Sequence, residues 1–265
     1  MKKNWTTEDL NNSLSLLIKK KITISKIEIN SKKIKNNSLF VPLEGKNFDG
    51  HQFIPEVLKK KNSYSLAEKN KLNNFKLNKF KQRLILVKNT KKSLNNLAKY
   101  SRSRFKGKIF AITGSVGKTS VKEAVKFILK KKLKIEANPG NFNNLLGMPL
   151  SLSNFKEKSN LGVLELGMNQ KGEIEKLSKI CKPNISLVTK ISNAHIGNFK
   201  SLNDIAMEKS KIFSGMDSSG IAILNNFDPY FNFLKKRALS EGLKNFIIFG
   251  KTNECNVKLL NVNKT

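Results

Sequence analysis

Residues 108–120 read KIFAITGSVGKTS, an apolar segment followed by a glycine-rich turn and the start of a helical pattern. Glycines let backbone N–H groups curve around an anion, and a helix N-terminus adds a favourable dipole. Lys118 can reach the β- and γ-phosphates of a nucleotide, and the Thr119 hydroxyl can ligate Mg²⁺. The general phosphate-loop pattern has glycine where Ile112 stands, so the match is partial. The strand, turn and helix context still favours a phosphate-binding loop over an incidental Gly-Lys pair.

Beyond this loop, apolar segments continue to alternate with helical patterns to the end of the chain. The expected strands are 108–112, 161–166, 185–189, 220–224 and 245–249. The expected helices are 118–132, 172–180, 201–213 and 228–239. Strands without polar alternation, separated by helices, are typical of a parallel sheet covered on both faces. We therefore predict an α/β fold with a P-loop-type, mostly parallel sheet, whose ligands bind at the carboxyl ends of the strands.

The first hundred residues have a less regular pattern that predicts a separate, small α/β domain. Its expected strands are 22–27, 38–43 and 84–87, and its expected helices are 10–18, 54–61 and 91–105. The Lys- and Asn-rich residues 62–83 are expected to form turns. We place the domain boundary between residues 105 and 106, which gives domains of 1–105 and 106–265.

The composition limits the classes of function. The 265 residues include 51 Lys+Arg and 19 Asp+Glu, so the formal net charge is +32. A basic ATPase that binds nucleic acid is one reading, but arginine, the commonest specific base reader, occurs only four times. Lysine and asparagine share A-rich codons, so a biased genome explains both excesses, and we expect no specific nucleic-acid partner. No apolar run approaches the roughly 20 residues of a membrane span, so no membrane insertion is expected. Cys181 and Cys255 suit neither a disulfide framework nor a zinc module. We expect a monomeric, cytoplasmic protein.

Two further loops follow predicted strands and carry candidate ligands. Glu165 ends the second strand of the sheet, where a carboxylate could hold Mg²⁺ beside phosphates. Taken alone, a glutamate at position 165 is more often a capping or surface residue than a metal ligand. His195 follows the third strand, although a lone histidine is more often structural. Among the lysines, nothing physical singles out Lys209.

Five segments together carry a resemblance to the Mur ligases, which build the peptide stem of peptidoglycan. The loop at 113–120 with Lys122 and Glu123 is similar to their ATP loop, which also lacks the outermost glycine. Within the family, the resemblance is to the MurF branch. The other segments that carry it are FVPLEGKNFDGHQFI at 40–54, GNFNNLLGMPL at 140–150, LELGMNQKGEI at 164–174 and the stretch from Ala194 to Phe213.

The resemblance implies a role for each matching residue. Gly114, Ser115, Val116, Gly117, Lys118, Thr119, Ser120 and Asn225 would contact ATP. Thr119 and Glu165 would hold one Mg²⁺, whereas His195 and a carbamylated Lys209 would hold a second. Lys118, Glu165, His195 and Lys209 would thus form the catalytic set. Ser31, Gly45, Lys46, Asn47, Asn141, Asn143 and Asn144 would contact the UDP-linked substrate.

The implied activity is an ATP-dependent amide ligation in cell-wall synthesis, and through it a part in cell shape and division. ATP would phosphorylate the terminal carboxylate of UDP-MurNAc-tripeptide, and the amine of D-alanyl-D-alanine would attack the acyl phosphate. Residues 1–105 would bind the UDP substrate and residues 106–265 would bind ATP. Another Mur ligase, or a relative of folylpolyglutamate synthase, remains an alternative.

The chain departs from the family pattern at three points. Asn30-Ser31-Lys32 replaces the usual Asp-Ser-Arg, and Gly197 replaces an acidic residue. The family's third domain has no counterpart in these 265 residues, so the isolated chain is expected to be inactive.

Overall fold

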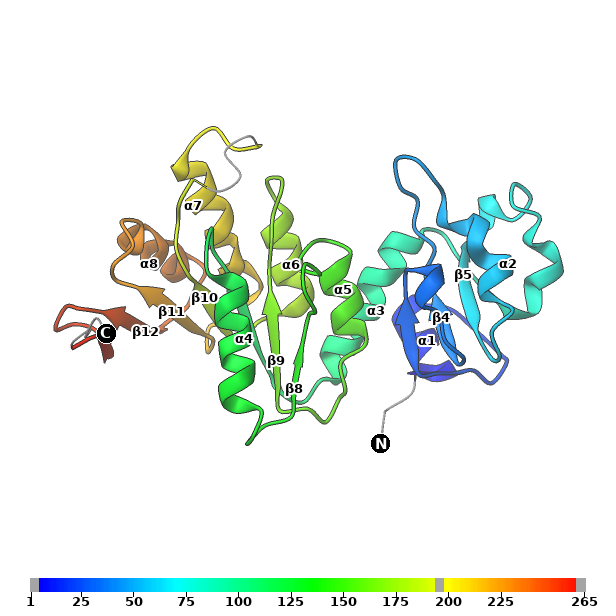
Figure 1. The fold of residues 1–265 in the computed structure, drawn as a ribbon, viewed down its shortest axis with the longest axis horizontal. Coiled ribbons are helices and arrows are strands. Elements are labelled where there is room, and N and C mark those ends of the chain that lie inside the picture. The colour runs from blue at the N-terminus through cyan, green and yellow to red at the C-terminus, as the bar shows by residue number, and fades with distance from the viewer. Residues whose placement is uncertain (1–4, 194–197, 261–265) are drawn as a thin grey trace. The chain divides into compact units, whose positions relative to one another are not determined.

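The computed structural model describes residues 5–193 and 198–260 and divides the chain into two compact units (Figure 1). The first unit runs to Arg104 and includes Leu152–Glu157, and the second holds Phe105–Ser151 and the chain from Lys158 onward. The return of Leu152–Glu157 to the first unit has no signal in the sequence pattern. No helix in the described part of the chain is long and apolar enough to span a bilayer.

The first unit is built on a four-stranded parallel sheet in the order β3-β4-β5-β6. Its strands are β3 (Lys26–Glu28), β4 (Ser38–Phe40), β5 (Tyr64–Glu68) and β6 (Leu84–Val87). Two short strands, β1 (Trp5–Thr6) and β2 (Thr23–Ile24), form a separate antiparallel pair. The helices are α1 (Thr7–Leu14), the single turn α2 (Ile54–Val57) and α3 (Thr90–Arg104).

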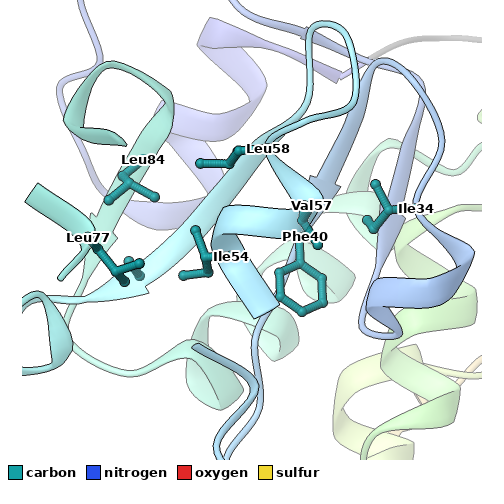
Figure 2. Packing of buried hydrophobic residues seen from close by; sticks show 8 residues of the cluster. Ile34, Phe40, Ile54, Val57, Leu58, Leu77 and Leu84 are labelled. Carbon is teal, nitrogen blue, oxygen red and sulfur yellow. The ribbon is translucent and has the colours of Figure 1, made fainter. Parts of the chain in front are cut away.

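A buried apolar cluster holds this unit together (Figure 2). Phe40 from β4 packs among Ile54 and Val57 of α2. The other buried members of the cluster are Ile34, Leu58, Ala67, Leu77 and Leu84. Each fully buried aliphatic or aromatic side chain contributes about 1.5–3 kcal/mol to folding. The short α2 therefore depends on this packing and not on its own helical propensity.

Several expectations for the first unit were wrong in detail. Residues 62–83 contain the buried strand β5 and short 3₁₀ turns, so they are not turns alone. The expected helix at 10–18 stops at Leu14, because Ser15 adopts a left-handed conformation with φ of 54°. Leu17, which the helical spacing placed on the apolar face, is 83% exposed.

The second unit contains a seven-stranded sheet, all parallel, in the order β13-β12-β11-β10-β7-β9-β8. The strands are β7 (Lys108–Thr113), β8 (Ile135–Ala137), β9 (Leu161–Glu165), β10 (Ile185–Val188), β11 (Ile221–Asn225), β12 (Asn245–Gly250) and β13 (Val257–Lys258). The helices are α4 (Lys118–Leu129), α5 (Gly147–Ser153), α6 (Glu173–Cys181), α7 (Leu202–Ser210) and α8 (Phe231–Ser240). The last residues of α5, from Leu152 onward, belong to the first unit. The predicted α/β fold with a parallel sheet is confirmed.

Both faces of the centre of this sheet are covered. Ile109, Phe110, Ala111 and Ile112 of β7 are all buried, although successive residues of a strand point to opposite faces. On one face, Phe110 and Ile112 pack against Val121 and other apolar residues of α4. The sequence patterns missed β8, α5 and β13, which are too short for a periodic signal. Since all seven strands are parallel, the chain leaves β7, β9, β10 and β11 at the same edge of the sheet.

Candidate active site

The glycine-rich turn after β7 is shaped by close contact with the segment after β10. Gly114 has φ of +146°, and a Cβ there would lie 1.9 Å from Thr189 Oγ1. Ser115 N donates to Lys190 O at 2.7 Å, and Ser115 Oγ donates to Ser192 O at 2.8 Å. Gly117, with φ of +86°, directs the chain into α4. The glycines are therefore required by geometry, and the predicted strand, turn and helix are present.

Lys118 opens α4 and folds back over its own loop. Its Nζ donates to Gly114 O at 2.8 Å and to Ser115 O at 3.2 Å. Burial lowers the pKa of this ammonium, and the negative charge of Glu165 partly opposes the shift. Backbone carbonyls are weaker partners for an ammonium than phosphate oxygens, because they carry no formal charge. Lys118 is therefore placed where it can exchange these carbonyls for an anion.

Glu165 ends β9 and is the carboxylate next to this loop. It is 2% exposed, and its Oε2 accepts a hydrogen bond from Thr119 Oγ1 at 2.8 Å. Its Oε1 accepts from Asn143 Nδ2 at 2.8 Å. Asn138 fixes the backbone of Glu165 on both sides, at 2.9 Å to the N–H and 2.9 Å to the carbonyl. The structure thus brings together Thr119, Asn143 and Glu165, which are remote in sequence.

Lys122 also belongs to this site, although only its place in a motif was noted from the sequence. Its side chain is fully buried, and its Nζ lies 3.5 Å from Glu165 Oε2. A lysine in an apolar-periodic helix normally indicates an exposed face, so no sequence signal identifies this contact. The partner of Lys122 is decided by the tertiary fold alone.

Lys209, on α7, reaches the same loop from a distant part of the chain. It is 1% exposed, and its Nζ donates to Gly114 O at 2.8 Å. Burial, together with the nearby charge of Lys118, lowers the pKa of Lys209 to about 7, whereas Glu208 raises it. The Glu208 carboxylate is engaged elsewhere, because it accepts from the backbone N–H groups of Gly172 and Ile174. His195, the expected neighbour of Lys209, lies outside the described residues.

Asn225 ends β11, beside the segment after β10. Its Nδ2 donates to Thr189 O at 3.3 Å, and its Oδ1 accepts from Phe227 N at 3.0 Å. Asp228, which sequence reasoning missed, accepts from Ile191 N at 2.7 Å and so orders the segment that contacts the glycine-rich loop. A contact between Asn225 and a nucleotide stays a prediction.

The three asparagines of the 140–150 segment have different positions. Asn143 contacts Glu165, as described above. Asn144 Oδ1 accepts from Leu146 N at 3.0 Å and Gly147 N at 2.9 Å, so it fixes the start of α5. The substrate contacts expected for Asn141, Asn143 and Asn144 stay predictions.

In the first unit, the expected substrate residues follow the carboxyl ends of β3 and β4. Ser31 begins a short 3₁₀ turn. Gly45, Lys46 and Asn47 are exposed in a tight loop closed by Gly45 N donating to Phe48 O at 2.9 Å. Lys71 Nζ holds this loop at both ends, at 3.2 Å from Glu44 Oε2 and 2.8 Å from Asp49 Oδ2. These two ion pairs order the loop, and no sequence pattern indicates the role of Lys71.

The arrangement around Glu165 suits a single cation held jointly with a ligand. Within residues 5–193 and 198–260, no three His, Cys, Asp or Glu side chains are grouped to hold a metal ion. Thr119 and Glu165 instead offer two oxygen donors beside a loop that bears lysines. Such a combination of hydroxyl, carboxylate and ammonium groups is typical of nucleoside triphosphate sites.

Comparison with known proteins agrees with the fold described above. Residues 112–265 match the Mur ligase middle domain, and residues 23–102 match the Mur ligase family, catalytic domain. The chain therefore belongs to the Mur ligase family. The predicted resemblance to the family is confirmed.

The relatives named below belong to the MurF branch. The UDP-N-acetylmuramoyl-tripeptide–D-alanyl-D-alanine ligase of Rickettsia prowazekii is 35% identical over 97% of this chain and 56% of its own length. That of Buchnera aphidicola subsp. Baizongia pistaciae is 39% identical over 86% of this chain and 48% of its own length. A MurF structure from Acinetobacter baumannii superposes with a TM-score of 0.81 at 27% identity, covering 93% of this chain and 53% of that one. A Thermotoga maritima MurF in complex with ADP gives 0.71 at 30% identity, covering 85% and 50%. The chain thus spans about half the length of these relatives.

Proposed function

We propose that this chain forms the UDP-substrate-binding and ATP-binding part of a ligase that joins D-alanyl-D-alanine to UDP-MurNAc-tripeptide. The names of the curated relatives support the reaction, and the ADP complex of the Thermotoga maritima MurF supports the nucleotide. The observation that carries the proposal is the pairing of Thr119 with Glu165 beside Lys118. We place this reaction in the cytoplasm and assign it to a monomer.

The residues beside the loop fit Mg²⁺. Thr119 Oγ1 and Glu165 Oε2 lie 2.8 Å apart, and both are hard oxygen donors of the kind that Mg²⁺ prefers. Mg²⁺ usually takes one or two protein ligands and fills its remaining positions with phosphate oxygens and water. When bound, it would neutralise charge on the phosphates. A second Mg²⁺, held by His195 and a carbamylated Lys209, is part of the proposal.

The low pKa of Lys209 supports its carbamylation. A lysine reacts with CO₂ as the neutral amine, which forms the C–N bond and releases a proton. With a pKa of about 7, a large share of Lys209 is neutral near physiological pH, whereas an ordinary lysine is almost fully charged. The carbamate would carry a negative charge beside Lys118, whereas the unmodified ammonium faces the like charge of Lys118 and donates to the uncharged Gly114 carbonyl.

The chemistry assigned to the chain's own side chains is electrostatic. The carboxylate of UDP-MurNAc-tripeptide would attack the γ-phosphorus of ATP, giving an acyl phosphate and ADP. Lys118 would stabilise the charge that spreads over the transferring phosphoryl oxygens. The amine of D-alanyl-D-alanine would then displace phosphate and form the amide. We assign the UDP end of the substrate to Ser31 and to Gly45, Lys46 and Asn47, in the loop ordered by Lys71.

Calorimetric titration of this chain with ADP tests the nucleotide site, in the presence and absence of Mg²⁺. We expect binding that strengthens with Mg²⁺, and a weaker response in Glu165→Gln. A separate titration with UDP-MurNAc-tripeptide tests the first unit, where Lys71→Ala should weaken binding by loosening the loop. Failure of ADP to bind, or equal ADP affinity with and without Mg²⁺, would contradict the proposal.

A further inference from the structure

Lys122 is a fully buried lysine to which the proposed chemistry assigns no role. It lies on α4 three residues after Thr119, so both side chains fall on the same helix face. Thr119 Oγ1 and Lys122 Nζ both approach Glu165 Oε2, at 2.8 Å and 3.5 Å. The hydroxyl and the ammonium therefore share one carboxylate oxygen.

The position of the ammonium is fixed by more than this ion pair. Lys122 Nζ donates to Asn138 O at 3.0 Å and to Gly140 O at 3.4 Å. The same Asn138 holds the backbone of Glu165 through its side-chain amide. Lys122 thus cannot leave Glu165 without giving up two carbonyl partners in a fully buried place. The position of the Lys122 Nζ beside Glu165 is therefore fixed.

A fixed positive charge next to a metal-binding carboxylate has two opposite effects. It offsets the large cost of burying the Glu165 carboxylate when no metal ion is bound. It also repels any divalent cation that approaches Glu165 Oε2. Glu165 is therefore a weak ligand for a free metal ion, and further negative charge is needed before a cation is held firmly. The phosphates of a nucleotide carry that charge.

We propose that Lys122 is a positioning residue that makes divalent-cation binding at Glu165 depend on nucleotide. It holds Glu165 against Thr119 and keeps the site closed to the free ion, so the metal enters together with the phosphates. This inference rests on the proposed function, because it takes Thr119 and Glu165 to be the metal ligands.

The test measures Mn²⁺ binding to the nucleotide-free chain by electron paramagnetic resonance, in wild type and Lys122→Met. Methionine keeps the approximate volume of the side chain and removes the charge. We expect Lys122→Met to bind Mn²⁺ about tenfold or more tightly than wild type, because one close repulsive charge is gone. Lys126→Met is the matched control, since Lys126 lies one turn further along α4 and pairs with Glu123 in solvent. It should bind Mn²⁺ as wild type does.

The double variant Lys122→Met/Glu165→Gln separates this role from a structural one. The double variant removes both charges. It should therefore lose the tighter Mn²⁺ binding of Lys122→Met, and its melting temperature should be higher than that of Lys122→Met. Mn²⁺ itself should raise the melting temperature of Lys122→Met and leave wild type unchanged. Equal Mn²⁺ affinity in wild type and Lys122→Met would overturn the inference. The inference would also be overturned if the melting temperature of Lys122→Met rose neither on addition of Mn²⁺ nor on the further substitution Glu165→Gln.

ADP binding by wild type, measured in parallel, reports on the proposed function separately. A chain that fails to bind ADP would refute the nucleotide site. The contrast between wild type and Lys122→Met in Mn²⁺ binding alone would still decide the role of Lys122.

Discussion

Replacing Lys209 by methionine tests the burial of a cation beside the glycine-rich loop. The ammonium is 1% exposed, donates to Gly114 O and has no carboxylate hydrogen-bond partner among those the structure records. Its pKa is lowered from 10.5 to about 7, chiefly by burial. The substitution keeps the approximate volume of the side chain and removes the charge, so it isolates the pH-dependent part of the stability.

The sign and size of the effect follow from proton linkage. Below pH 7 both the folded and the unfolded chain bind the proton, so the full cost of burying the charge is present. Between pH 7 and 10.5 the unfolded chain binds more protons than the folded chain, so the free energy of unfolding rises with pH. Between pH 6 and pH 9 this gain is about 2–3 kcal/mol in wild type and absent in Lys209→Met. The lost hydrogen bond to Gly114 O costs about 1 kcal/mol at every pH.

The assay is urea unfolding at pH 6, 7, 8 and 9 in bicarbonate-free buffer, which prevents carbamylation. Far-UV circular dichroism is the probe, because the single tryptophan, Trp5, belongs to the first unit. Lys211→Met is the control, since Lys211 is more exposed to solvent and should keep the wild-type pH profile. Parallel pH profiles for wild type and Lys209→Met would refute the reasoning, because they would mean that Lys209 is solvated or paired.

Three other predictions concern the same loop. Lys118→Ala should weaken ADP binding roughly 10- to 100-fold in calorimetry, since a charge-assisted contact is worth about 1.5–3 kcal/mol, and an unchanged affinity would remove Lys118 from the phosphate site. Gly114→Ala should lower the free energy of unfolding by about 1–3 kcal/mol more than Gly140→Ala in urea titrations. Both glycines have positive φ, but only a Cβ at Gly114 meets a neighbour, so equal losses would contradict the described packing. Finally, ¹³C-bicarbonate at pH 8 should give a carbamate carbonyl signal in nuclear magnetic resonance that Lys209→Met lacks, and a signal surviving that substitution would place the modification elsewhere.

Features that arise from residues close together in the chain could be predicted before the fold was known. The glycine-rich turn could be predicted because Gly114 and Gly117 supply backbone conformations that other residues rarely adopt. The parallel sheet could be predicted because both faces of its central strands are buried, which leaves continuous apolar runs in the sequence. Glu165 could be placed near the loop because parallel strands end at a common edge. The sequence patterns missed β8, and they predicted a helix at 54–61 where α2 ends at Val57. Both elements are short, because packing and not intrinsic propensity defines them.

Which polar groups meet inside the second unit depends on packing between segments that are distant in the chain. Lys122 and Lys126 lie on one helix and look alike in sequence, yet one is fully buried against Glu165 and the other is paired in solvent. Lys209 reaches Gly114 across 95 positions of the chain, because α7 follows β10 and the crossover returns it to the edge where β7 ends. Burial and charge proximity arise from packing between distant segments, whereas periodicity and turn chemistry are local. For this reason the sequence could predict a phosphate-binding loop, but the cations that converge on its carboxylate and carbonyls could be found only in the folded chain.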